Sequence, residues 1–330
     1  MQNIKYKKLC IRIAIAVLIN TLLLQSISTV AYGIASSLTP FLRNFAREYS
    51  INSSDLIYAF EQTLVLFAYL ISFLIPAFIF KFMIRNDDPE PVRYGIKLEP
   101  NTPLVIIGSI GIVIGAAYIN SFMVSFIDFA PLFETDPMSS PVRVLMSFIS
   151  IALVPALSEE FLFRGCILSN LLPYGKNTAI ILSALLFALM HGNFAQFFYT
   201  FIAGIVLGAV YVKTDSIWAP TFIHLFNNFY SVAQQFIYEQ NGKDAAINKI
   251  LFVLDMTIVC FGLALGGWLL YKTLRRTDSV PSAVPTRKYN LGRKELAKGF
   301  FNPIMIVHIA VSFVLAVIIV VMALMLPYMQ

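Results

Sequence analysis

Apolar runs of about 20 residues recur along this chain, and they limit the folds that it can adopt. A run of about 20 apolar residues is long enough for an α-helix to cross the hydrocarbon core of a bilayer. Only 13% of the residues are charged and 58% are hydrophobic, whereas about one quarter of a soluble domain is charged. This composition excludes a soluble α/β domain. The sequence predicts an all-α fold, a polytopic bundle of transmembrane helices.

The apolar runs predict eight to nine spans. We expect them at 11–34, 57–81, 103–127, 144–172, 177–192, 195–213, 216–236, 250–271 and 302–326. The first run is longer than the apolar region of a signal peptide, which favours a retained anchor over a cleaved signal. The ninth follows a Ser/Pro-rich linker at 277–286, so we expect it to be a peripheral addition to an eight-span body. The spans divide the chain into an N-terminal part (1–143), a polar-residue core (144–236) and a C-terminal part (237–330).

The basic residues predict the orientation of the chain in the membrane. They gather at the N-terminus and in the loop 272–299, whereas the charged residues of the loop 128–142 are all acidic. Because basic residues mark the cytoplasmic side, we expect the N-terminus and the loop 272–299 inside, and the C-terminus outside. The net charge of +6 therefore bears on topology, and no nucleic-acid partner is expected. We expect the membrane to be a bacterial plasma membrane.

Two adjacent glutamates, Glu159 and Glu160, lie inside the fourth apolar run. An acidic residue in a membrane-spanning helix costs about 2.5–3.5 kcal/mol on insertion scales and usually marks a functional site. Glu160 and Arg164 are four residues apart, so they share a helix face and are expected to pair. Glu159 lies roughly 140° around the helix from Arg164, which makes it the freer carboxylate. A buried ion network that only holds helices together is the structural alternative.

Two histidines are expected near these carboxylates. The fourth and fifth runs form a hairpin that turns near Gly175, and Glu159 and His191 lie at equal sequence distance from it. This places both residues at one depth, roughly 20–24 Å from the turn. His224 and Asn228 lie on one face of the seventh run and can donate hydrogen bonds into a cavity, as an oxyanion site requires. Interhelical hydrogen bonding is the alternative for Asn228.

Other small and polar residues in the spans are assigned to packing. Pairs of glycines four residues apart occur at Gly111/Gly115, Gly204/Gly208 and Gly262/Gly266, and such pairs let helices approach closely. His308, in the ninth run, is also assigned to packing. Pro155 removes a backbone donor, so a carbonyl one turn earlier needs a partner from a cavity or a neighbouring helix.

Three motifs in the core resemble those of a known family. Glu159-Glu160-x-x-x-Arg164, Phe187-x-x-x-His191 and His224-x-x-x-Asn228 are similar in order and spacing to the motifs of the CPBP family. That family comprises the type II CAAX prenyl endopeptidases and bacterial relatives called Abi or bacteriocin-processing proteins. The resemblance covers 144–236 and implies a catalytic core of an intramembrane endopeptidase.

The resemblance also implies roles for the residues in the motifs. Glu159 would be the general base, His191 would help to position and activate water, and His224 and Asn228 would form the oxyanion site. Glu160 and Arg164 would support this geometry. The resemblance favours catalysis without a cofactor; if a metal is used, zinc held by Glu159, His191 and His224 is the alternative. The expected partners are the lipid bilayer and a peptide or membrane-protein substrate, with or without a lipid attached.

Two other classes of function stay open. A transporter or proton relay could use the same buried Glu/His network, although such folds often contain inverted repeats, and the sequence shows none. A non-catalytic bacteriocin-immunity or scaffold protein could keep the same motifs.

Overall fold

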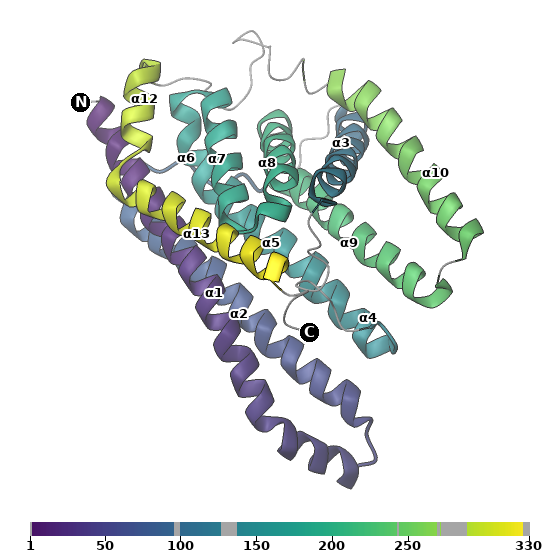
Figure 1. Ribbon diagram of the computed structural model, residues 1–330. Helices are drawn as coiled ribbons and strands as arrows, with labels where there is room; N and C mark the ends of the chain where they lie inside the picture. Colours follow the sequence, from purple (N-terminus) through teal and green to yellow (C-terminus); the bar gives the residue numbers. More distant parts are fainter. Residues whose placement is uncertain are drawn as a thin grey trace.

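A computed structural model describes residues 2–95, 100–126, 137–242, 244–268, 271 and 289–325 (Figure 1). The described residues form helices joined by short loops, and no strand occurs among them. The prediction of an all-α bundle is therefore confirmed.

Apart from the first, the helices follow the predicted runs closely. The α-helices are α1 (Gln2–Glu48), α2 (Ser53–Ile84), α3 (Thr102–Val124), α4 (Pro141–Ser147), α5 (Val154–Glu160), α6 (Ser169–Leu171), α7 (Lys176–Met190), α8 (Phe194–Thr214), α9 (Trp218–Asn241), α10 (Ala245–Phe261), α12 (Arg293–Phe300) and α13 (Pro303–Met325). Three π-helical segments are η2 (Phe148–Leu153), η3 (Phe161–Leu168) and η5 (Gly262–Gly266), and a 3₁₀ turn is η4 (Leu172–Tyr174). From α4 to η4 the elements follow one another without a break; we call this stretch, Pro141–Tyr174, the motif helix.

Each of the nine predicted spans falls on a helix, but seven helices among the described residues are long and apolar enough to cross a membrane. The helix α7 falls short because its 15 residues extend only about 22 Å at 1.5 Å per residue. The helix α9 has the length but not the hydropathy, because one side of it carries the polar residues of a cavity described below. The seven apolar helices make this an integral membrane protein.

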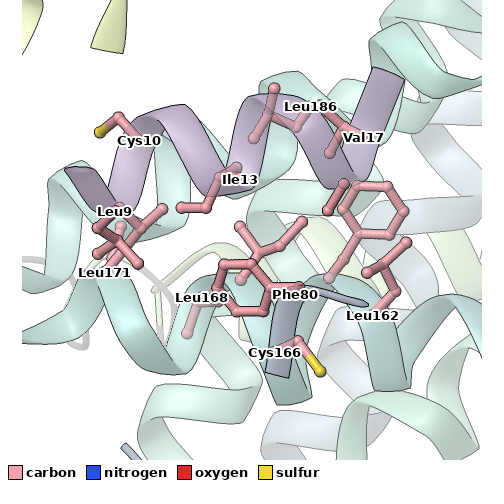
Figure 2. Close-up of a cluster of buried hydrophobic side chains, with 14 of the residues drawn as sticks. Leu9, Cys10, Ile13, Val17, Phe80, Leu162, Cys166, Leu168, Leu171 and Leu186 are labelled. Carbon is pink, nitrogen blue, oxygen red and sulfur yellow. The ribbon is translucent and has the colours of Figure 1, made fainter. Parts of the chain in front are cut away.

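The first helix is longer than expected. It continues to Glu48, well beyond the predicted boundary at residue 34, and forms with α2 a hairpin that projects from the bundle (Figure 1). Nearer the N-terminus, α1 supplies Leu9, Ile13 and Val17 to the main hydrophobic core. Figure 2 shows these side chains in one cluster with Phe80 of α2 and Leu186 of α7. The motif helix is thus held by residues from both sides of it in the sequence.

The glycine pairs pack as predicted. A Cβ atom on Gly111 would lie 2.5 Å from the Cα atom of Gly262, and one on Gly108 would lie 2.4 Å from that of Gly266. The helix α3 therefore touches α10 and η5 backbone to backbone. A Cβ atom on Gly204 would likewise meet Ala184 at 2.9 Å, which fixes α8 against α7.

The last helix lies against α1, α7 and α8. Met305, in its first turn, is fully buried in the main core, while residues such as Ile306 and Phe313 are exposed. His308 is fully buried, in line with its assignment to packing. Most of the two loops that predicted the orientation lies outside the described residues, namely 128–136 and 272–288, and the second range includes the linker 277–286. The orientation therefore stays a prediction.

Candidate active site

The motif helix is irregular around Glu159 and Glu160. Two π-helical segments, η2 and η3, flank the seven residues of α5. In a regular α-helix the carbonyl of Ile151 would accept a hydrogen bond from the N–H of residue 155, which proline lacks. Asn228 of α9 donates its side-chain amide to this carbonyl at 3.1 Å. The neighbouring helix thus supplies the partner that Pro155 required, and interhelical bonding by Asn228 is directly seen.

Glu160 and Arg164 form the predicted pair. Arg164 Nη1 lies 2.9 Å from Glu160 Oε1, and both side chains are fully buried. Arg164 also donates to the carbonyl of Gly204 at 3.3 Å, and its guanidinium lies 4.5 Å from the centre of the Phe187 ring. The cation is therefore enclosed on several sides by the protein.

Glu159 is held differently. Its Oε1 atom accepts a hydrogen bond from the hydroxyl of Tyr69 on α2, while its Oε2 atom has no hydrogen-bond partner among the described residues. The side chain is 3% exposed. As the helical phase predicted, Arg164 pairs with Glu160, and no arginine or lysine among the described residues pairs with Glu159.

The two histidines each have one ring nitrogen occupied. His191 Nδ1 lies 2.8 Å from the carbonyl of Phe187, and His224 Nδ1 lies 3.0 Å from Glu160 Oε1. A carbonyl and an ionised carboxylate only accept hydrogen bonds, so both Nδ1 atoms carry the hydrogen. In the neutral rings each Nε2 atom is then an acceptor, and that of His224 lies 3.9 Å from Glu159 Oε2.

The ring of Phe187 connects these groups. Its centre lies 5.1 Å from that of His191 and 6.0 Å from that of His224, both in edge-to-face contact. Together with the guanidinium of Arg164 on the same ring, these contacts fix the two imidazoles relative to each other. The sequence marked Phe187 as part of a motif but assigned it no role.

All four residues predicted to be catalytic, Glu159, His191, His224 and Asn228, line one cavity of about 470 Å³. This volume lies in the usual range of ligand-binding pockets, about 300–1,000 Å³. Glu160 and Arg164 do not line it and instead lie behind Glu159 and His224. The wall includes residues that the sequence did not single out as part of the site: Tyr69, Tyr199, Asn227, Gln196 and Thr200.

Two of these additional residues, Asn227 and Tyr199, form a hydrogen-bonded chain with Asn228. Asn227 donates to the hydroxyl of Tyr199 and, at 3.1 Å, to the side-chain oxygen of Asn228. Asn227 could have been suspected because it adjoins Asn228. Tyr69 and Tyr199 come from helices outside the three motifs and have no spacing that would mark them.

The alternative of a zinc ion held by Glu159, His191 and His224 stays a prediction. No group of three or more His, Cys, Asp or Glu side chains within the described ranges is arranged to hold a metal ion. His191 and His224 each bond through Nδ1 to a carbonyl or a carboxylate and keep an Nε2 lone pair, an arrangement that zinc-binding histidines also adopt. We derive no step that passes through a metal.

Comparison with known proteins identifies the region that carries this site. Residues 141–230 match the Rce1-like family, type II CAAX prenyl endopeptidases. The Rce1-like region begins with the motif helix, ends within α9, and contains all six residues predicted for the site. The resemblance inferred from the motifs is thus confirmed over this region.

A curated relative agrees with this match. The chain is 31% identical over 138 residues to CAAX prenyl protease 2 of Arabidopsis thaliana, an alignment that covers 34% of this chain and 42% of that protein. The chain thus spans less than half the length of this relative. No solved structure matches the chain.

Proposed function

We propose that this protein is an intramembrane endopeptidase in which Glu159 activates water to hydrolyse a peptide bond. The observation that carries the proposal is the position of Glu159. It is the one carboxylate among the described residues that line the cavity, its Oε2 atom has no partner, and two histidines share the cavity with it.

The attacking water would lie between two of the available lone pairs. A water molecule between Glu159 Oε2 and the Nε2 atom of His191 can donate a hydrogen bond to each, since both are acceptors. Glu159 then removes one proton as the water oxygen attacks the peptide carbonyl, and later delivers that proton to the leaving amine. Tyr69 holds Oε1, so the carboxylate presents its other oxygen to the water.

The oxyanion requires hydrogen-bond donors. Asn228 gives one amide hydrogen to Ile151 and keeps a second for the oxyanion. His224 can donate only if Nε2 also carries a hydrogen, which makes the ring an imidazolium. Glu160, 3.0 Å from Nδ1, stabilises that charge, so the supporting role proposed for Glu160 and Arg164 has a physical basis.

The substrate and the setting are also part of the proposal. We expect cleavage near the C-terminus or in a leader of a membrane-associated peptide or protein, in a bacterial plasma membrane. The N-terminus would lie in the cytoplasm and the C-terminus outside. Reporter fusions at residues 1 and 330 test this orientation: a periplasmic reporter should be active only at the C-terminus, and activity at the N-terminus would reverse it.

The central test compares the peptides of cells that express the wild-type protein with those of cells that express Glu159→Gln. Glu61→Gln is a matched control, because Glu61 is a half-buried glutamate of α2 that does not line the cavity. Cleavage products should appear with the wild-type and control proteins and be absent with Glu159→Gln at equal expression. Identical product sets for all three proteins would contradict the proposal. Proton-coupled flux in liposomes that is lost in Glu159→Gln would instead favour the transporter alternative.

A further inference from the structure

A second buried carboxylate lies outside the catalytic group. Asp255, on α10, is 1% exposed and was not singled out by the sequence. It accepts hydrogen bonds from the hydroxyls of Tyr118 and Tyr230. The side-chain amide of Gln234 lies 2.9 and 3.1 Å from its two oxygens. Asp255 therefore joins three helices, α3, α9 and α10.

The charge of this carboxylate is not balanced by a cation. Within the described ranges, no lysine, arginine or histidine forms an ion pair with Asp255. Buried charges in proteins are usually paired, because an isolated charge is costly to remove from water. Neutral donors hold Asp255, and its negative potential extends to the groups around it.

Those groups face the cavity of the candidate active site. Tyr118, Tyr230 and Gln234 all line it, whereas Asp255 lies behind them. Because the two hydroxyl hydrogens are donated to Asp255, the hydroxyl oxygens can act only as acceptors toward a ligand in the cavity. The side-chain oxygen of Gln234 is an acceptor as well. This part of the wall therefore offers acceptors backed by a negative charge, which suits a hydrogen-bond donor that carries positive charge.

The spacing along α9 relates this wall to the catalytic group. Tyr230 and Gln234 follow His224 by six and ten residues on the same helix, or about 9 and 15 Å along its axis. An extended peptide advances about 3.3 Å per residue. A peptide bond held near His224 would thus place a side chain about three to five residues away beside Tyr230 and Gln234.

We propose that Tyr118, Tyr230 and Gln234, backed by Asp255, form a subsite that binds a lysine or arginine side chain of the substrate about three to five residues from the cleaved bond. This inference rests on the proposed function, because it names the substrate class of the same cavity. The competing explanation is that Asp255 only ties α10 to its neighbours. The glycine contacts between α3 and α10 already join these helices, so Asp255→Asn is expected to fold.

Binding can be measured without turnover. In the Glu159→Gln protein, fluorescent leucine-rich decapeptides with one central lysine or one central norleucine serve as probes. We expect the lysine peptide to bind about tenfold more tightly, and the ratio to fall to about twofold or less when Asp255→Asn is added. Asp244→Asn is the matched control, because Asp244 caps the same helix and is exposed. Equal dissociation constants for the two peptides in Glu159→Gln would overturn the subsite.

Cleavage of a randomised decapeptide library by the wild-type protein gives the second readout. Mass spectrometry should find lysine and arginine enriched at one position three to five residues from the cleaved bond, and Asp255→Asn should remove that enrichment. A purely structural Asp255 would change total cleavage but not the enrichment. If the wild-type protein cleaves the library without preferring lysine or arginine at any position, the subsite is refuted and the proposed function stands. If the lysine peptide binds more tightly but the wild-type protein cleaves nothing, the proposed function is refuted and the subsite stands.

Discussion

Breaking the buried pair of Glu160 and Arg164 should destabilise the protein strongly, whereas replacing both residues should not. Both side chains are fully buried, and they share one hydrogen bond of 2.9 Å. Arg164 Nε and Glu160 Oε2 have no partner among the described residues. The pair is therefore far from the ideal bidentate geometry in which attraction best offsets desolvation.

The magnitudes follow from this geometry. Arg164→Met leaves the carboxylate of Glu160 buried with only His224 beside it, and we expect the free energy of unfolding to fall by about 3–5 kcal/mol. The double variant Glu160→Leu/Arg164→Met removes both charges. Apolar replacement of a buried ion pair is often neutral or stabilising, so we expect most of the loss to be recovered.

Reversible unfolding in mixed micelles, followed by circular dichroism, measures these differences. The double variant should nevertheless lose activity, because His224 Nδ1 has lost its acceptor and the ring is no longer oriented. Stability within about 1 kcal/mol of wild type for Arg164→Met, or a double variant as unstable as the single one, would refute the reasoning. Recovery of activity together with stability would refute the orienting role of Glu160.

Further changes test other parts of the structure. Tyr69→Phe removes a hydrogen bond to a charged group, worth about 1.5–3 kcal/mol, and should lower turnover more than it lowers expression; an unchanged turnover number would exclude Tyr69 from the site. Asn228→Ala should cost about 1 kcal/mol in unfolding experiments through the lost bond to Ile151 and should also slow cleavage, so a loss of stability alone would leave only the packing role. Gly111→Leu should separate α3 from α10 and abolish folded protein in detergent, whereas the same change at the open position Gly33, which has no neighbour within 4 Å, should be tolerated. If the proposed function holds without a metal, chelation of the purified protein should leave cleavage unchanged; loss of cleavage that zinc restores would favour the metal mechanism.

The sequence predicts the helices and the pairing of Glu160 with Arg164 well, for physical reasons. Apolar length identifies a membrane helix, and spacing on one helix identifies the partners Glu160 and Arg164, since both signals are local. The predicted count of nine spans exceeds the seven long apolar helices, because α7 is short and α9 is polar on the side that lines the cavity. Where α7 and α9 lie in the bundle depends on the helices packed against them.

Contacts between distant segments are what the sequence could not supply. Tyr69 meets Glu159 across 90 residues, and Tyr118 meets Asp255 across 137. A single tyrosine in an apolar run has no pattern that distinguishes a hydrogen-bonded side chain from one that faces lipid. The partner that Pro155 needed could be anticipated as a requirement, but not as Asn228.

The hydrogen bond from Asn228 to the carbonyl of Ile151 has a consequence for the insertion and folding of the chain in the membrane. Ribosomes make the chain from the N-terminus, so Pro155 enters the bilayer before α9 has been synthesised. Until Asn228 arrives, the carbonyl of Ile151 lacks the donor that a regular helix would have given it, and a lone backbone polar group in hydrocarbon costs several kcal/mol. The region around Glu159 therefore reaches its final shape late, only when α9 is in place. A nascent chain that ends before α9 should carry Glu159 in an incompletely bonded helix, where membrane quality-control proteases can recognise it.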